Sequence, residues 1–166
     1  MTDPDSFSNF ANRSSSKWLR YPADVLPMHV AEMDFDVAEP IRARLAQMVA
    51  NSDLGYLGPF AKAGQAFESF ALNRWGWQLD PTHVKMATDV GVAAVEILKA
   101  ATGPGEQVLV NTPVYAAFFS WLKEADCTPV DAPLVLEGDT WKLDLPAIRA
   151  AFESGVKVYL LCSPQN

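Results

Sequence analysis

The chain has 166 residues, of which 49% are hydrophobic and 20% are charged, a composition typical of one globular domain and not of a disordered chain. Thirteen basic residues against twenty acidic ones give a formal net charge of -7, so the long-range field repels phosphate backbones and excludes nucleic acid as a partner. No apolar stretch approaches the roughly 20 residues that cross a bilayer, which excludes insertion into a membrane.

Two sequence features indicate a cytoplasmic protein with reduced cysteines. The first part of the sequence is polar and lacks the basic start and apolar core of a secretory signal, so we expect a cytoplasmic location. Cys127 and Cys162 lie far apart, and neither has a cysteine or histidine nearby at metal-ligand spacing. We therefore predict free thiols in the core, with neither a disulfide framework nor a metal site.

The N-terminal region is predicted to be an irregular arm followed by a helix. Residues 1–40 are rich in Asp, Ser, Asn and Pro, and Pro40 favours the first turn of a helix. Apolar residues then recur at helical spacing, so we expect this helix to pack by one face. These residues are Ile41, Leu45, Met48 and Val49. We accordingly divide the chain into an arm with its first helix, residues 1–50, and a larger domain, residues 51–166.

Strands and helices are predicted to alternate in the larger domain. A second amphipathic helix, which carries Phe67, Phe70, Ala71 and Trp75, ends at Gly76. Beyond it we predict strands at 84–87, 108–111 and 156–162, helices at 92–101 and 115–125, and a helix that Asp144 caps and that runs to about Glu153. Residues 128–143 are predicted to be extended, with a tight turn at 137–139. This alternation predicts βαβ units, a mostly parallel sheet and the α/β class.

Three loops of the predicted sheet are candidate binding segments, because ligands of open α/β sheets bind at the carboxyl ends of strands. In residues 88–92, Gly91 allows backbone N–H groups at a helix start to face an anion. Residues 111–115 place Tyr115 directly after a strand, and residues 161–166 place Asn166 after another. Taken singly, these residues have ordinary interpretations as a turn glycine, a packing ring and a turn or cap residue.

Together and in this order, the three segments resemble the fold-type I pyridoxal-phosphate enzymes of the aminotransferase class I/II superfamily. The run DVLPMHVAEMDF, residues 24–35, is similar to the DVLPMWVADMDF segment of the cystathionine or cysteine-S-conjugate β-lyase branch. Gly55-Tyr56, Gly103-Pro104-Gly105-Glu106 and Thr112-Pro113-Val114-Tyr115 support the same assignment, and the resemblance covers the whole chain. It implies the N-terminal part of the family's large domain, with a mostly parallel sheet, flanking helices and a preceding irregular arm.

The resemblance also implies a cofactor site for pyridoxal 5'-phosphate. Val90, Gly91 and Val92 match the turn that cradles the cofactor phosphate, which suits backbone N–H donors at a helix start. Tyr115 matches the ring that stacks on the pyridine, and Asn166 matches the amide that binds the phenolic oxygen. No metal takes part in this chemistry.

Two further segments are implied to serve the substrate and the partner subunit of a homodimer. Tyr56 matches a residue that reaches the cofactor phosphate of the partner subunit. Val30, Ala31, Glu32 and Met33 match the arm that closes over the carboxylate of an amino-acid substrate. A tryptophan is common in the family where His29 stands, so the resemblance leaves the substrate preference near the arm open.

The activity implied by the resemblance is β-elimination. L-Cystathionine or another cysteine S-conjugate would yield pyruvate, ammonia and a thiol, and the alternative within the superfamily is transamination. The family's Schiff-base lysine has no counterpart in the sequence, so we assign no catalytic residue and expect the 166-residue chain to be inactive by itself. Ser14-Ser15-Ser16-Lys17 is superficially similar to the lysine segment, but it lies in the polar arm before any strand.

No helix is predicted after the last strand that could cover the sheet on that side, and a parallel sheet is normally covered on both faces. We therefore expect the 166 residues to be a piece of a larger unit. A non-enzymatic alternative stays open, in which the chain is a regulatory fragment or a remnant without activity.

Overall fold

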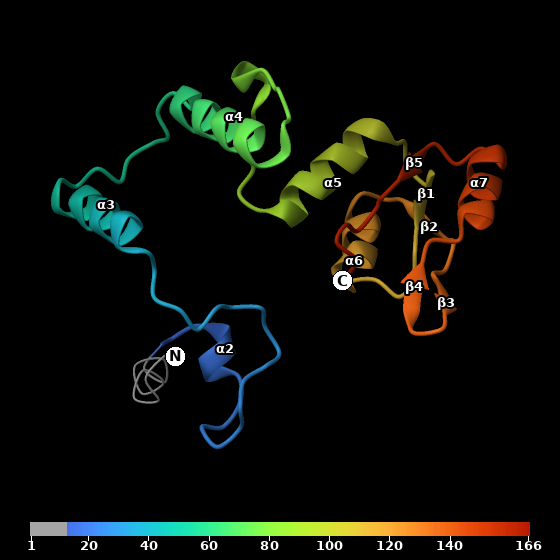
Figure 1. The fold of residues 1–166 in the computed structure, drawn as a ribbon, viewed down its shortest axis with the longest axis horizontal. Coiled ribbons are helices and arrows are strands. Elements are labelled where there is room, and N and C mark those ends of the chain that lie inside the picture. Colours follow the sequence, from blue (N-terminus) through green and yellow to red (C-terminus); the bar gives the residue numbers. More distant parts are fainter. Residues whose placement is uncertain (1–12) are drawn as a thin grey trace. The chain divides into compact units, whose positions relative to one another are not determined.

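The computed structural model describes residues 13–166, and the chain divides after Gly58 into two compact units (Figure 1). The boundary between residues 50 and 51, drawn at the end of the first predicted helix, stays a prediction. Within the described residues, none of the helices is both long enough and apolar enough to cross a membrane.

Within residues 13–58, the first unit contains two helices, α2 (Ser16–Leu19) and α3 (Glu39–Ala50). Residues 20–38 between them form neither helix nor strand, as predicted for the arm. Pro40 lies in the first turn of α3, as predicted. No residue of α3 is buried, so the expectation that this helix packs by one face is wrong within the described chain. The helix therefore keeps an apolar face open, formed by Ile41, Leu45 and Val49.

The second unit begins with helix α4 (Ala61–Trp75) and the short 3-10 helix η2 (Pro81–His83). The helix ends at Gly76, as predicted, because φ of 64° is the left-handed conformation that glycine adopts without strain. The strand predicted at 84–87 is wrong. Val84 has extended dihedral angles, φ -71° and ψ 123°, but a strand also needs a hydrogen-bonded neighbour, and among the described residues it has none.

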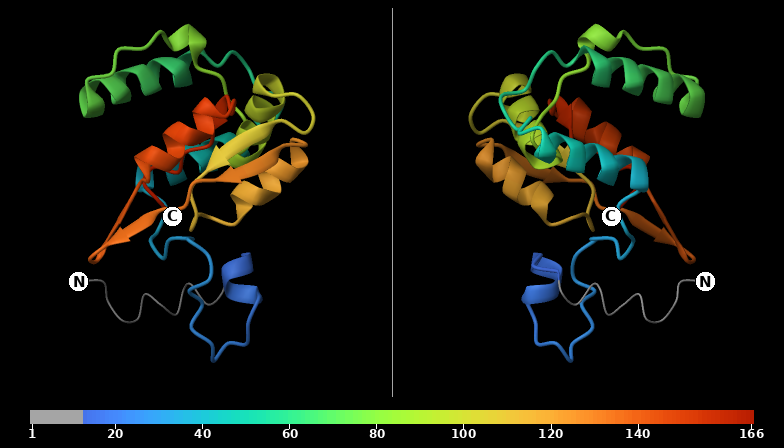
Figure 2. Two further views of the ribbon diagram at one scale, coloured as in Figure 1. Left: turned by 90° about the vertical axis from the view of Figure 1, so that its right-hand side faces the viewer. Right: turned by 90° about the vertical axis from the view of Figure 1, so that its left-hand side faces the viewer.

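A three-stranded parallel sheet forms the centre of the second unit. Strand β1 (Gln107–Val110) lies between β2 (Thr128–Asp131) and β5 (Val158–Tyr159), and β5 is shorter than the predicted 156–162. A separate antiparallel hairpin joins β3 (Val135–Glu137) to β4 (Thr140–Lys142) around the predicted turn. Since all three sheet strands run the same way, the segments that follow them emerge at one edge (Figure 2).

Three helices complete the second unit: α5 (Val90–Ala101), α6 (Ala117–Glu124) and α7 (Leu145–Glu153). Side chains of β1 alternate between two cores. Val108 and Val110 pack with Leu98 of α5 and Leu122 of α6, whereas Leu109 packs with residues of α7. Helices α6 and α7 thus lie on opposite sides of the sheet (Figures 1 and 2). The predicted α/β class with a mostly parallel sheet is confirmed.

Candidate functional site

A shallow pocket of about 370 Å³ lies at the carboxyl edge of the sheet. It brings together Tyr115 and Asn166, two of the residues that the sequence singled out. The remaining lining comes from the loop before α6, the β3–β4 hairpin and the C-terminal segment, namely Pro113, Val114, Leu134, Trp141 and Gln165. The pocket therefore presents two aromatic rings and two side-chain amides within one cavity.

The loop that carries Tyr115 is fixed to the neighbouring strand by polar contacts. The backbone N–H of Thr112 donates to Asp131 Oδ1 over 3.0 Å, and the Thr112 hydroxyl donates to the other oxygen of the same carboxylate. The N–H of Leu134 donates to Thr112 O over 2.7 Å. These bonds hold the start of the loop against the end of β2, so Tyr115 projects from an anchored base.

The C-terminal segment that carries Asn166 is also anchored. Leu160 N–H donates to Leu109 O over 2.9 Å, which extends the pairing of β5 with β1. Gln165 Nε2 then donates to Pro113 O over 2.6 Å and ties the segment to the loop of Tyr115. The two walls of the pocket are thus joined at its rim.

Helix α5 begins with the turn predicted to bind a phosphate. Asp89 caps the helix, and its Oδ1 accepts from Val92 N–H over 2.9 Å. Of the three predicted residues, Val92 therefore already has an acceptor for its N–H. The N–H groups of Val90 and Gly91 have no acceptor within the helix, as at every helix start, and they remain for an outside anion.

Gly91 lies where a side chain would not fit. A Cβ at this position would lie 2.8 Å from Trp121 Nε1 of α6 and 3.1 Å from Asp89 Oδ1. The missing side chain lets the start of α5 approach the indole N–H of Trp121, so that an indole donor lies beside the backbone N–H of Gly91. The Trp121 ring also contacts Tyr115 edge-on, with ring centroids 6.1 Å apart and an interplanar angle of 72°. Trp121 thus links the α5 turn to the pocket.

These residues fit the chemical parts of pyridoxal phosphate. A helix start with free N–H groups and a neighbouring indole N–H suits the phosphate, and the Tyr115 ring and Asn166 amide suit a flat pyridine with a phenolic oxygen. One feature opposes an anion, since the Asp89 carboxylate lies at the same helix start. Val92 N–H already donates to that carboxylate, and the positive end of the helix dipole offsets part of its charge, which leaves the N–H groups of Val90 and Gly91 and the Trp121 indole for the phosphate.

The predicted arm residues belong to the first unit. Glu32 is the most constrained of them: its carboxylate accepts from Ser15 Oγ over 2.8 Å, and its carbonyl accepts from Lys17 Nζ over 2.8 Å. Val30, Ala31 and Met33 are exposed. Tyr56 is fully exposed at the end of the same unit. Their roles toward substrate and partner stay predictions.

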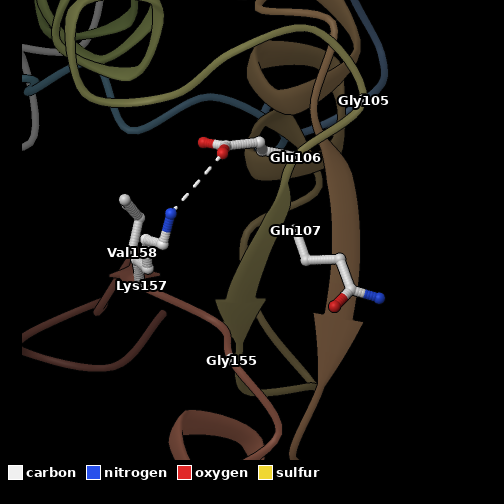
Figure 3. A pocket seen from close by; sticks show the side chains of 6 residues that line it. All are labelled: Gly105, Glu106, Gln107, Gly155, Lys157 and Val158. Carbon is white, nitrogen blue, oxygen red and sulfur yellow. Dashed lines mark ion pairs between the residues drawn. The ribbon is translucent and has the colours of Figure 1, made fainter.

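A second pocket opens at the opposite, amino end of β1 and β5 (Figure 3). The two charged residues that line it neutralise each other, because Lys157 Nζ lies 3.8 Å from Glu106 Oε1. The other carboxylate oxygen, Glu106 Oε2, accepts a hydrogen bond from Gly103 N–H over 3.0 Å. Among residues 13–166, no three His, Cys, Asp or Glu side chains cluster as metal ligands. We therefore place the candidate site at the carboxyl edge.

Three residues of this region were not singled out by the sequence: Asn111, Trp121 and Trp141. Asn111 is almost fully buried, with 3% exposure, and its Nδ2 donates to Ala132 O over 2.7 Å. Its Oδ1 accepts from the Tyr159 hydroxyl. Burial raises the pKa of Tyr159 above its ordinary value. The position of a polar residue directly after a buried strand is a signal by which Asn111 could have been found, whereas the two tryptophans carry no local signal.

Comparison with known proteins places these features in a family. The sequence model described as "Aminotransferase class I and II" matches residues 23–166. A Mycobacterium tuberculosis protein provisionally named cystathionine beta-lyase is 36% identical over 166 residues, which cover 94% of this chain and 40% of that protein. The chain thus spans about 40% of the length of the curated relatives it matches.

Two solved structures match over nearly the whole chain. A pyridoxal-phosphate-bound protein from Clostridium difficile, provisionally described as an aminotransferase, has a TM-score of 0.85 at 26% identity and covers 100% of this chain and 43% of its own. A protein from Corynebacterium diphtheriae, provisionally described as a pyridoxal-phosphate-dependent β-cystathionase, has a TM-score of 0.84 at 28% identity, with 96% and 41% covered. The N-terminal part of the fold-type I large domain is therefore confirmed as the fold.

Proposed function

Since the chain belongs to the class I and II aminotransferase family, we propose that it forms the N-terminal part of a pyridoxal-phosphate-dependent carbon–sulfur β-lyase. The observation that carries the proposal is the pocket shared by Tyr115 and Asn166, which Trp121 connects to the start of α5. Relatives named as cystathionine β-lyases favour the lyase over the transaminase.

The residues of the second unit would bind and orient the cofactor. Backbone N–H groups of Val90 and Gly91 would donate to its phosphate, with Val92 completing the turn. The Tyr115 ring would stack on the pyridine, and the Asn166 amide would donate to the phenolic oxygen. When bound, pyridoxal phosphate supplies an electron sink for the electrons released at the substrate's Cα.

The residues of the first unit would serve the substrate and the partner. We propose that the segment of Val30, Ala31, Glu32 and Met33 closes over the carboxylate of an amino-acid substrate, where its backbone N–H groups are potential donors. We also propose a homodimer in which Tyr56 reaches the phosphate held by the partner. The full exposure of Tyr56 and the open apolar face of α3 support an interface in this unit. The cytoplasmic location stays a prediction.

The substrate proposed is L-cystathionine or another cysteine S-conjugate. With one water, cystathionine would give homocysteine, pyruvate and ammonia, so that one C–S bond breaks and the amino group is released by hydrolysis. We further propose that the 166 residues do not turn over substrate alone. They span about 40% of the length of relatives, and a covalent lysine is expected outside the matched portion.

The test is product analysis with the full-length protein from its native cells, supplied with pyridoxal phosphate and L-cystathionine but without a keto acid. We expect stoichiometric pyruvate, ammonia and thiol. Amino-group transfer that appears only after a keto acid is added would instead support the transaminase. The 166-residue chain, treated with cofactor and borohydride, should give no adduct at a single lysine, and a stoichiometric adduct would contradict its proposed incompetence.

A further inference from the structure

One buried amide joins the three strands of the sheet at the edge where the candidate site lies. Asn111 follows β1 directly, its Nδ2 donates to Ala132 O beyond β2 over 2.7 Å, and its Oδ1 accepts from the hydroxyl of Tyr159 in β5. Asn111 is 3% exposed, so water does not compete for these bonds. Removing either partner would leave a buried polar atom unsatisfied.

The orientation of this amide is fixed by its partners. Ala132 O can only accept a hydrogen bond, so it must face the NH2 group of Asn111. That leaves Oδ1 toward Tyr159, whose hydroxyl must then be the donor. The Tyr159 ring is held in turn by Phe152 of α7, with centroids 6.3 Å apart. Both ends of the network are therefore anchored in the fold.

The network lies at the base of both pocket walls. Four residues after Asn111 the chain reaches Tyr115, and β5 with its Tyr159 leads into the segment that ends at Asn166. Gln165 joins the same two segments at the rim, through its bond to Pro113 O. The spacing of Tyr115 and Asn166 is thus constrained by two hydrogen bonds, the buried one of Asn111 and the exposed one of Gln165.

We propose that Asn111 and Tyr159 are positioning residues that set the spacing between Tyr115 and Asn166, and so the affinity for pyridoxal phosphate. This inference rests on the proposed function. The two residues need not touch the cofactor: their hydrogen bond holds the loop after β1 and the segment after β5 at a fixed separation. A flat ring between two walls binds tightly only when the walls are already at the right distance.

The test uses the full-length protein stripped of cofactor and titrated with pyridoxal phosphate, with the dissociation constant read from tryptophan fluorescence. Tyr159→Phe removes one oxygen and keeps the ring against Phe152, so this variant should fold. We expect Tyr159→Phe, which loses one hydrogen bond, to weaken binding about three- to ten-fold. Asn111→Ala also loses the bond to Ala132 O and should weaken binding at least as much. The double variant should bind about as weakly as Asn111→Ala alone, because that substitution already removes the bond that Tyr159→Phe removes.

Val156→Ala is the matched control. Val156 is buried in the same cluster as Leu109 and Ala132 but lies before β5, away from the pocket. Its truncation should lower the denaturation midpoint and leave the dissociation constant within about two-fold of wild type. Unchanged binding in Tyr159→Phe and Asn111→Ala, or equal weakening in Val156→Ala, would overturn the positioning role alone. Wild-type protein that binds no pyridoxal phosphate would overturn the proposed function as well.

Discussion

Lys17 Nζ lies 2.7 Å from Asp34 Oδ2. This ion pair joins α2 to the residue that follows the predicted substrate segment, residues 30–33. Lys17 is 6% exposed although its side chain is cationic, and it also donates to Glu32 O over 2.8 Å. Arg13 reinforces the contact by donating to Met33 O over 3.2 Å. The second half of the predicted substrate segment and the residue after it are therefore held by α2 and by Arg13.

The first prediction concerns this ion pair. Lys17→Met should free residues 30–35 and destabilise the first unit by about 2 kcal/mol, because Asp34 and Glu32 O would lose a charged partner in a partly buried place. Limited proteolysis with thermolysin should cut the arm faster in the variant. Lys62→Met, at an exposed position of α4, is the control and should leave the rate unchanged. Equal protection in wild type and Lys17→Met would contradict the role of the pair.

The second prediction separates two effects of Asp89. Asp89→Ala removes the cap of α5 and should cost about 1 kcal/mol in the free energy of unfolding, whereas Asp89→Asn keeps a capping oxygen and should cost little. Asparagine also removes the negative charge beside the N–H groups of Val90 and Gly91. Asp89→Asn should therefore bind pyridoxal phosphate more tightly than wild type. Fluorescence titration measures this, and weaker binding by the asparagine variant would argue against a phosphate at this turn.

The third prediction uses the missing side chain of Gly91. Gly91→Ala would place a methyl group 2.8 Å from Trp121 Nε1, so the ring must move. We expect weaker cofactor binding and a changed tryptophan emission spectrum. Gly103→Ala adds a methyl group 3.9 Å from its nearest neighbours and should change neither. Adding Trp121→Phe to Gly91→Ala should recover part of the lost thermal stability, and no recovery would place the strain elsewhere.

Much of the fold was predictable because helix and strand ends carry local signals. Asp144 caps α7 through Ala147 N–H over 3.0 Å, and Gly76 ends α4 in a left-handed conformation. The strand at 84–87 was not predictable in this way. Its residues have the right composition and Val84 has an extended backbone, but a strand exists only with a paired neighbour. Local preference decides backbone conformation, and non-local pairing decides whether a sheet forms.

The site was predictable where its residues follow strands, and hidden where they come from other elements. Tyr115 and Asn166 were chosen because both follow strands, and they do share a pocket. Trp121 and Trp141 lie within a helix and a hairpin, where aromatic residues are ordinarily packing residues. The contact of Trp121 with the α5 turn depends on how α6 packs against α5, which the spacing of residues in sequence does not encode.

The last prediction is a pH dependence of stability. Burial raises the pKa of Tyr159, so the folded protein favours the neutral phenol more than the unfolded chain does. The stability that the neutral phenol contributes is fully present below the ordinary tyrosine pKa of about 10. It is lost as the pH rises through the higher pKa that Tyr159 has in the folded protein. The free energy of unfolding, measured by denaturation at about pH 8 and about pH 11, should therefore fall more between these pH values in wild type than in Tyr159→Phe, which has no phenol to ionise.

Tyr115→Phe, at a half-exposed ring, is the control, and its free energy of unfolding should fall as much as that of wild type. Identical pH profiles for wild type and Tyr159→Phe would show that the neutral phenol contributes nothing, and the bond to Asn111 would then not be a stabilising link between β1 and β5.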